Sequence, residues 1–151
     1  MCTYNANGNL VRVTDALGGN STNAYDANGN LTLTTNRENE WVKYEYDGMN
    51  RLVKQTNQLN NANAYTYDPA GNTMTCSDGN HHITTYAYDG VNRIVSVTDA
   101  VGSVTAYTYD YLGNVATLTE TQGDGSCVYP RRQRQHPICH RPAGQHHQLR
   151  L

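Results

Sequence analysis

The stretch YAYDGVNRIVSVTDAVG, residues 86–102, contains two turn signals separated by a short apolar run. In YAY the tyrosines alternate with alanine, which places both rings on one face of a β-strand. DGVNR is typical of a chain reversal, because Asp accepts backbone hydrogen bonds and Gly or Asn tolerates a positive φ. IVSVT then predicts a second strand and TDAVG a second reversal. The stretch therefore predicts two short strands, joined by a first and followed by a second reversal.

The same pattern recurs every 21 residues along the chain. The segments are YNANGNL, YDANGNL, YDGMNRL, YDPAGNT, YDGVNRI and YDYLGNV, and each begins at one anchor tyrosine: Tyr4, Tyr25, Tyr46, Tyr67, Tyr88 and Tyr109. Fixed self-similarity of this kind indicates a repeat architecture rather than an ordinary β-sandwich with regularly spaced turns. No segment shows the 3.6-residue period of a helix. We expect an all-β antiparallel meander of about a dozen strands over residues 1–126.

The residues expected to shape each repeat are the anchor tyrosine, the following aspartate and the glycine of the first reversal. They are predicted to act as structural repeat anchors, and they are Tyr25, Asp26, Gly29, Tyr46, Asp47, Tyr67, Asp68, Gly71, Tyr88, Asp89, Tyr109, Asp110 and Gly113.

The recurring aspartates also admit a catalytic or calcium-binding interpretation. However, they occur singly, whereas catalytic carboxylates come in pairs with different environments and calcium loops cluster acids at alternate positions. No nucleophile elbow is recognisable either. We expect no catalytic, metal-binding or cofactor-binding residues, and no enzyme activity.

These motifs resemble the YD-repeat, or Rhs, family over residues 1–126, most clearly in YDGMNRLV, YTYDPAGN and YDGVNRIVSVTDAVG. The family includes bacterial polymorphic toxins, insecticidal toxin-complex components and animal teneurins. The resemblance implies a curved or spiralling β-sheet that closes into a hollow shell, which in the toxins encloses a C-terminal toxic domain. It also implies a parent protein that is secreted or at the cell surface.

The chain also departs from the family pattern. Six repeats are fewer than a closed shell needs, and Asp68-Pro69 lies in an ordinary repeat turn rather than in a shell-closing segment. We expect an interior fragment of a longer protein, without the toxin. Its partners would be neighbouring repeats and the encapsulated toxin, and unpaired edge strands would make the fragment self-associate.

A second class of function stays open, namely a cell-surface module that binds carbohydrate or protein. Tyrosine rings and Asn or Asp groups on an extended sheet could contact sugars. Regular tyrosine stripes more often serve cross-strand packing, which favours the structural shell.

The final stretch, VYPRRQRQHPICHRPAGQHHQLRL at residues 128–151, differs from everything before it. It holds five of the eleven basic residues and none of the thirteen acidic ones. A basic arm or a zinc site formed by Cys127, Cys139 and the tail histidines is conceivable, but the spacing matches no common zinc pattern. RRQR could bind phosphate only through charge, so no specific nucleic acid is expected.

A frameshift explains the tail better than either alternative. Arg, His, Gln, Pro and Leu all have codons that begin with C, and a one-base shift permits the reading VYTHDANGNTLSVTDPxGNITNYGY. The reading fails only at Pro130, where the shifted codon permits His and not the seventh anchor Tyr. We therefore expect residues 127–151 to be frameshifted and unstructured.

The overall composition sets the remaining limits. The chain has no Phe, one Trp and twelve Tyr, and a formal net charge of −2. No apolar run is long enough to span a membrane, and the first residues show no signal peptide. The four cysteines form no CxxC pair and predict no disulfide framework.

Overall fold

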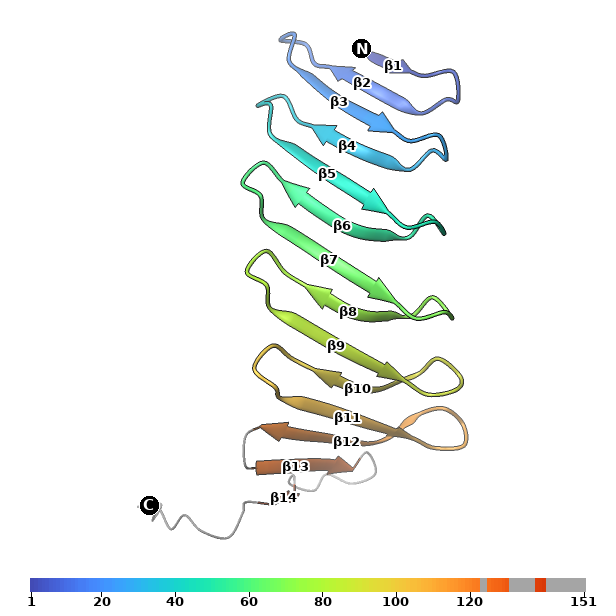
Figure 1. Ribbon diagram of the computed structural model, residues 1–151, viewed down its shortest axis with the longest axis vertical. Coiled ribbons are helices and arrows are strands. Elements are labelled where there is room, and N and C mark those ends of the chain that lie inside the picture. Colours follow the sequence, from blue (N-terminus) through green and yellow to red (C-terminus); the bar gives the residue numbers. More distant parts are fainter. Residues whose placement is uncertain (123–124, 131–137, 141–151) are drawn as a thin grey trace, which may run out of the picture. The chain divides into compact units, whose positions relative to one another are not determined.

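The computed structural model describes residues 1–122, 125–130 and 138–140, with side chains up to residue 121. All of its regular elements are β-strands (Figure 1). They are β1 (Cys2–Tyr4), β2 (Leu10–Thr14), β3 (Asn20–Tyr25), β4 (Leu31–Thr35), β5 (Trp41–Tyr46), β6 (Leu52–Asn57), β7 (Ala62–Tyr67), β8 (Thr73–Ser77), β9 (Ile83–Tyr88), β10 (Ile94–Thr98), β11 (Val104–Tyr109), β12 (Val115–Gln122), β13 (Gly125–Pro130) and β14 (Ile138–His140).

The strand order in the sheet is the order along the chain, from β1 to β14, and the neighbouring strands whose register is defined run antiparallel. The predicted all-β antiparallel meander is therefore confirmed. The chain divides into two compact units. Unit 1 comprises Met1–Tyr67 and Thr75–His82, and unit 2 comprises Asp68–Met74 and Ile83–Leu151.

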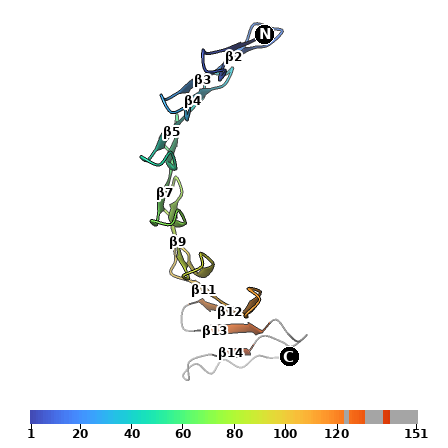
Figure 2. The same ribbon diagram turned by 90° about the vertical axis from the view of Figure 1, so that its right-hand side faces the viewer.

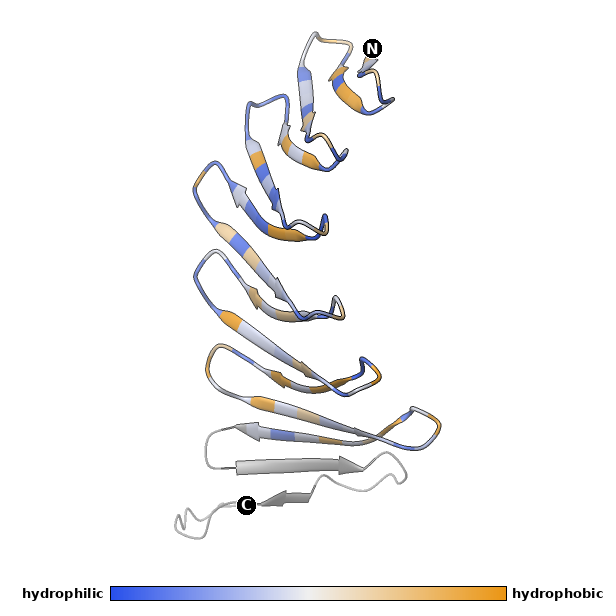
Figure 3. Cartoon of the chain, turned by 45° about the vertical axis from the view of Figure 1, so that its right-hand side comes forward, coloured by the Kyte–Doolittle hydropathy of each residue, from blue (hydrophilic) through white to orange (hydrophobic). Residues whose placement is uncertain are grey.

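Each unit is a single layer of strands, as the edge-on view shows (Figure 2). None of the residues whose side chains are described is fully buried, so the described part of each unit lacks a core of the usual kind. Apolar residues instead gather where β2, β4 and β6 begin (Figure 3). Because no second layer covers them, each strand pair can shield these side chains only against its neighbours in the sheet.

A β-bulge lies at the anchor tyrosine of the repeats. Tyr25 pairs with Leu31 and Ala24 pairs with Leu33, which leaves Thr32 as an extra residue in β4. The same shift occurs at Tyr4, Tyr46, Tyr88 and Tyr109. A bulge inserts one residue on one strand and so reverses the alternation of faces beyond it.

The bulge decides which side chains share the tyrosine face. Cross-strand partners lie on the same face, so Leu52 lies beside Tyr46 and Gln55 beside Tyr44. Simple alternation would have put Lys54 on the face of Leu52. The bulge places Lys54 opposite Glu45 instead, where its side chain is exposed.

The sheet continues into residues that were expected to be unstructured. Residues 125–130 form β13 along β12, and residues 138–140 form β14 along β13. The open edge of β12 offers backbone N–H and C=O groups, which can pair with a strand of almost any sequence. Residues 131–137 and 141–151 lie outside the described part of the chain.

Candidate functional site at the repeat junctions

The anchor tyrosines of five repeats join each repeat to the one before it. Every one of these hydroxyls donates a hydrogen bond to a backbone carbonyl fifteen residues earlier. We call this contact the tyrosine latch. The bonds are Tyr25 to Leu10 at 2.9 Å, Tyr46 to Leu31 at 2.9 Å, Tyr67 to Leu52 at 2.7 Å, Tyr88 to Thr73 at 2.9 Å and Tyr109 to Ile94 at 2.6 Å.

The latch acts where the backbone ladder between repeats stops. Strands β2 and β3 pair only through Arg12 with Thr22, Val13 with Ser21 and Thr14 with Asn20, and the same three-pair ladder joins β4 to β5, β6 to β7 and β10 to β11. The carbonyl that accepts the latch lies beyond the end of this ladder. A backbone carbonyl without a partner is costly where water is excluded, and the tyrosine hydroxyl supplies one.

The first tyrosine shows what the preceding repeat contributes. Tyr4 has no earlier strand beside it, and it is 61% exposed. The other anchors are partly buried. Burial raises the pKa of Tyr46 and of Tyr88 above the ordinary value. The raised pKa keeps these two hydroxyls protonated and able to donate at physiological pH.

We predict that Tyr88→Phe lowers the free energy of unfolding by about 1 kcal/mol, because it removes the latch hydroxyl and leaves the ring in place. Tyr86→Phe is the matched control, since among the described residues its hydroxyl makes no hydrogen bond to protein. Urea denaturation of both variants measures the difference. Equal losses in the two variants would show that the latch bond contributes nothing.

The two reversals of a repeat have the same geometry. In the first, Asp26 Oδ1 accepts the N–H groups of Asn28 at 3.0 Å and Asn30 at 2.8 Å. In the second, Asp15 Oδ1 accepts those of Leu17 and Gly19, both at 2.8 Å. The side chains that accept at least one such bond are Asn5, Asp15, Asp26, Asn36, Asp47, Asn57, Asp68, Asp78, Asp89, Asp99 and Asp110.

The fourth residue of each reversal has a left-handed backbone. Gly29 has φ 87° and Gly71 has φ 94°, while Asn50 and Asn92 take the same position with φ 60° and 62°. The second reversals place Gly18, Asn39, Asn60, His81 and Gly102 there. Gly has no Cβ to clash, and Asn is among the side chains most tolerant of this region.

These hydrogen bonds hold the aspartate pKa values below their ordinary value of 3.8. The main cause is the side-chain amide of Asn30 for Asp26, the backbone N–H of Arg51 for Asp47 and that of Gly19 for Asp15. The pKa values of Asp68, Asp78 and Asp89 are lowered in the same way.

Acid should therefore weaken the fold. Because the folded-state pKa values lie below the unfolded value, the stabilisation is complete above pH 3.8 and is lost as the pH falls through the folded values. We expect the urea midpoint to drop steadily below about pH 4. Asp26→Asn keeps the acceptor, as Asn5 does naturally, and should reduce this acid sensitivity. A midpoint that does not change with acid would contradict the prediction.

Two repeats carry Arg in place of Asn after the left-handed residue, and this Arg contacts the next repeat. Arg51 Nε donates to Asp47 Oδ2 at 2.7 Å, and its guanidinium lies 4.6 Å from the ring centre of Tyr67. Arg93 likewise binds Asp89 at 2.7 Å and lies 4.3 Å from the ring centre of Tyr109. Each guanidinium therefore covers an anchor tyrosine while its own aspartate holds it in place.

The same two repeats also contact the repeat before them. Asn50 Oδ1 accepts a hydrogen bond from Asn30 Nδ2 at 2.8 Å, and Asn92 Oδ1 accepts one from Asn72 Nδ2 at 2.8 Å. The sequence pattern DxxNR was predicted only as a reversal. Its Asn and Arg in fact connect one repeat to both of its neighbours.

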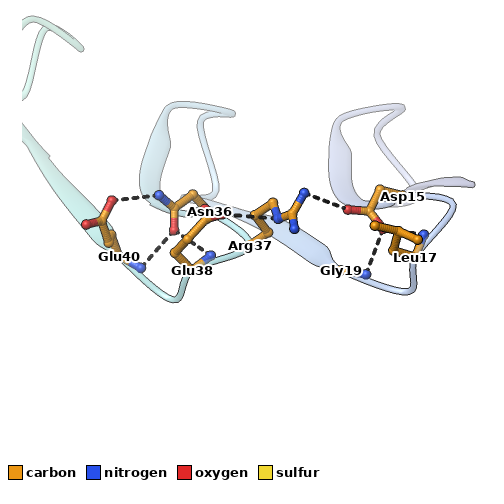
Figure 4. A network of polar contacts seen from close by, with 7 residues as sticks. All are labelled: Asp15, Leu17, Gly19, Asn36, Arg37, Glu38 and Glu40. Atoms are coloured by element: carbon orange, nitrogen blue, oxygen red, sulfur yellow. Dashed lines mark hydrogen bonds and ion pairs between the residues drawn. The ribbon is translucent and has the colours of Figure 1, made fainter.

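A weaker connection links the second reversals at the other ends of the strands. Arg37 lies 3.4 Å from Asp15 of the preceding reversal and 3.1 Å from Glu38 (Figure 4). Asn36 Nδ2 donates to Glu40 at 2.8 Å. The Arg37 and Glu38 side chains are more than half exposed, so water and salt screen these ion pairs strongly.

The described residues contain no group of three or more His, Cys, Asp or Glu that could hold a metal ion. Cys2 and Cys76 are free thiols. The tail residues considered for zinc lie outside the part of the chain whose side chains are described. Within the described ranges, no helix is long and apolar enough to cross a membrane.

A single-layer antiparallel sheet whose repeats are joined by identical side-chain contacts defines an open-ended β-repeat protein. Residues 4–39, 25–62 and 88–126 each match the family model of the RHS Repeat. The chain therefore belongs to the RHS repeat family. A comparison with curated protein sequences found no match.

The fold is shared with solved structures. The crystal structure of TcdB2-TccC3 without hypervariable C-terminal region matches 92% of this chain with a TM-score of 0.68 and 16% identity. The crystal structure of TcdB2-TccC3-Cdc42 matches 92% with a TM-score of 0.66 and 15% identity. The matched region is 9% of either neighbour, so this chain is similar to a small part of a much longer protein.

Proposed function

We propose that the chain is a non-catalytic wall segment of an Rhs-type shell. The observation that carries the proposal is the tyrosine latch, which connects one repeat to the next without a buried core. A sheet built in this way can be extended by adding repeats at its edges, because each repeat needs only its neighbours for stability. This property suits a wall and provides no catalytic centre.

The residues that we assign to this role are the thirteen repeat anchors predicted from the sequence. Tyrosines supply the latch, aspartates accept the N–H groups of the first reversal, and glycines supply its left-handed residue. We place the repeat segment at residues 1–126.

In the whole protein, the shell would enclose a C-terminal toxin, and the protein would be secreted or displayed at the cell surface. The family membership and the shared fold with TcdB2-TccC3 support this proposal. The partners of this segment would then be the neighbouring repeats and the enclosed domain.

A chimaera tests the wall function directly. The matched segment of TcdB2-TccC3 would be replaced with residues 1–126, and electron microscopy would show whether the sheet continues through the insert. Protease digestion would then measure protection of the hypervariable C-terminal region. We expect a continuous sheet and a protected region. A sheet that breaks at the insert, in a chimaera that is otherwise folded, would refute the proposal.

The isolated chain should self-associate, because β1 pairs with β2 along one edge and leaves its other edge open. Sedimentation velocity over a range of protein concentrations would detect the association. The N–H of Cys2 faces this open edge, because the adjacent Met1 exchanges its backbone hydrogen bonds with Thr14 at the end of β2. A Cys2→Pro variant removes that N–H and should associate less. A wild-type chain that stays monomeric throughout would contradict this prediction.

We also propose that residues 127–151 arise from a frameshift. The support is their composition and the permitted reading, which restores the Asp, the Gly and the second reversal of a seventh repeat. Sequencing of the coding DNA tests the proposal. A frame shifted by one base from Cys127 should encode YxY and TDxxG motifs, and a shifted frame without them would refute it.

A further inference from the structure

The sequence contains two Asn-Gly pairs, Asn7-Gly8 and Asn28-Gly29. Asparagine is a thermolabile residue, and its side chain reacts most readily with the next backbone nitrogen when that residue is glycine, which has no Cβ to hinder the approach. Both pairs lie at the same place in the first reversals of their repeats, and both asparagines are exposed. The wall function makes no use of their side chains.

The backbone of the two pairs is alike. Gly8 has φ 79° and Gly29 has φ 87°. The N–H of Gly8 donates to the carbonyl of Asn5 at 3.0 Å. That of Gly29 donates to the carbonyl of Asp26 at 3.1 Å. The glycine nitrogen, which would attack the asparagine side chain, is therefore held in the same way in both reversals.

The side-chain amide distinguishes the two asparagines. Asn28 Nδ2 donates a hydrogen bond to Asn50 Oδ1 of the next repeat at 3.0 Å. Asn50 takes the left-handed position of its reversal, and the second repeat has Gly29 at this position. Glycine has no side chain that could accept a bond from the repeat before it. Among the described residues, the amide of Asn7 therefore makes no hydrogen bond to protein.

The bond to Asn50 restrains the reactive group of Asn28. To reach the nitrogen of the next glycine, the Asn28 side chain must rotate, and its hydrogen bond must break first. One hydrogen bond of typical net strength slows such a step about threefold to tenfold. Asn7 has no such bond to break. We propose that Asn7 is a site of spontaneous deamidation, and that the contact between Asn28 and Asn50 protects the second Asn-Gly pair.

The reaction needs only water as a co-reactant. The backbone nitrogen of Gly8 loses its proton and attacks Cγ of Asn7. The new bond from nitrogen to Cγ replaces the bond from Cγ to Nδ2, and the amide group leaves as ammonia with that proton. One water molecule then opens the cyclic imide. Cleavage between nitrogen and Cγ gives aspartate, whereas cleavage between nitrogen and the backbone carbonyl carbon of Asn7 gives isoaspartate.

Both products change the first reversal. Each one replaces a neutral amide with a carboxylate and so adds one negative charge. In isoaspartate the main chain also runs through Cβ and Cγ, which lengthens the reversal by one atom. The N–H groups of Asn7 and Gly8 now donate to the side chain and the carbonyl of Asn5. The longer main chain displaces Gly8 from its acceptor and should loosen the reversal.

Aspartate before glycine can form the same cyclic imide, but the reversals restrain it. Asp47 precedes Gly48, and its Oδ1 accepts the N–H groups of Met49 at 2.9 Å and Arg51 at 3.0 Å. Its Oδ2 accepts a bond from Arg51 Nε at 2.7 Å. Imide formation at Asp47 would break all three bonds. The exposed amide of Asn7 is therefore the more reactive group.

Peptide mapping of the full chain measures both sites in one sample. The folded protein would be aged at low concentration in mildly alkaline buffer and then cleaved with trypsin, which separates residues 1–12 from residues 13–37. Fragmentation mass spectrometry assigns the mass gain to one asparagine. We expect Asn7 to deamidate about threefold to tenfold faster than Asn28. In guanidinium chloride the two rates should be equal, because both asparagines lie in the sequence ANGNL.

Two opposite substitutions test the role of the acceptor. Asn50→Gly removes it and should raise the deamidation rate of Asn28 to that of Asn7. Other repeats carry glycine at this position, so the variant should fold. Asn92→Gly makes the same change two repeats later and should leave the rate at Asn28 unchanged. Gly29→Asn instead supplies an acceptor and should slow the deamidation of Asn7 about threefold or more.

Two results would overturn the proposal. One is a folded chain in which Asn7 deamidates no faster than Asn28, which includes the case that neither reacts. The other is a rate at Asn28 that is the same in Asn50→Gly as in Asn92→Gly. If Asn50→Gly does not fold, the rate at Asn7 in Gly29→Asn decides the question. These results are independent of the chimaera test, so the wall function and the modification site can fail separately.

Discussion

Tyr67→Ala should lower the free energy of unfolding by about 3 kcal/mol, the largest loss expected of any single substitution in the sheet. The change removes the latch hydrogen bond to Leu52, worth about 1 kcal/mol, and the contact with the Arg51 guanidinium, worth about 0.5–1 kcal/mol. The partly buried ring contributes the remainder, at roughly 25 cal/mol per Å² of apolar surface.

Tyr111→Ala is the control for this change. Tyr111 is a tyrosine of the same repeat pattern, but it lies at the tip of a reversal and is 94% exposed. Urea denaturation should show almost no loss for Tyr111→Ala. Hydrogen exchange would show which strands are destabilised in Tyr67→Ala. We expect the backbone amides of β6 and β7 to lose protection before those of the other strands. Similar losses of unfolding free energy in the two variants would show that the latch is not the main connection between repeats.

Gly71→Val is the second large effect, with an expected cost of about 2–3 kcal/mol. Gly71 has φ 94°, a conformation that a β-branched residue adopts only with strain. Nothing lies within 4 Å of the Cβ position, so the cost is conformational and not steric crowding by neighbours. Thermal denaturation would measure it.

Two further variants show whether the backbone is the cause. Gly71→Asn should recover most of the loss, because Asn50 and Asn92 hold the same position in other repeats. Gly90→Ala, in the neighbouring reversal, should be nearly neutral, since Gly90 has neither a positive φ nor a close neighbour. A Gly71→Asn variant as unstable as Gly71→Val would contradict this explanation.

The recurrence of tyrosine and turn residues was sufficient to predict the strands, the reversals and the meander. Local chemistry explains this success, because each reversal is formed by side chains of its own residues. Asp26, for example, accepts bonds only from residues two and four positions on. Interactions of this kind can be recognised in a sequence without knowledge of the three-dimensional fold.

The connections between repeats could not be predicted in the same way. The latch of Tyr88 ends on a backbone carbonyl, and a backbone acceptor leaves no mark in the sequence. The bulges at the anchors depend on how two strands align, which the spacing of apolar residues does not specify. Arg51 and Arg93 did carry a signal, since both follow Asn 42 residues apart, but their contact with the next tyrosine requires the fold.

The backbone acceptor of the latch has a consequence for how such genes change. Tyr88 donates to the carbonyl of Thr73, whereas the other latch tyrosines donate to carbonyls of Leu or Ile. The latch therefore does not depend on the side chain of the accepting residue. Recombination between the similar coding segments can duplicate, delete or exchange a repeat. At the new boundary, the anchor tyrosine then meets a backbone carbonyl that can accept its hydrogen bond. Unequal crossing-over can lengthen or shorten the protein in steps of one repeat, and no compensating mutation is needed at the new boundary.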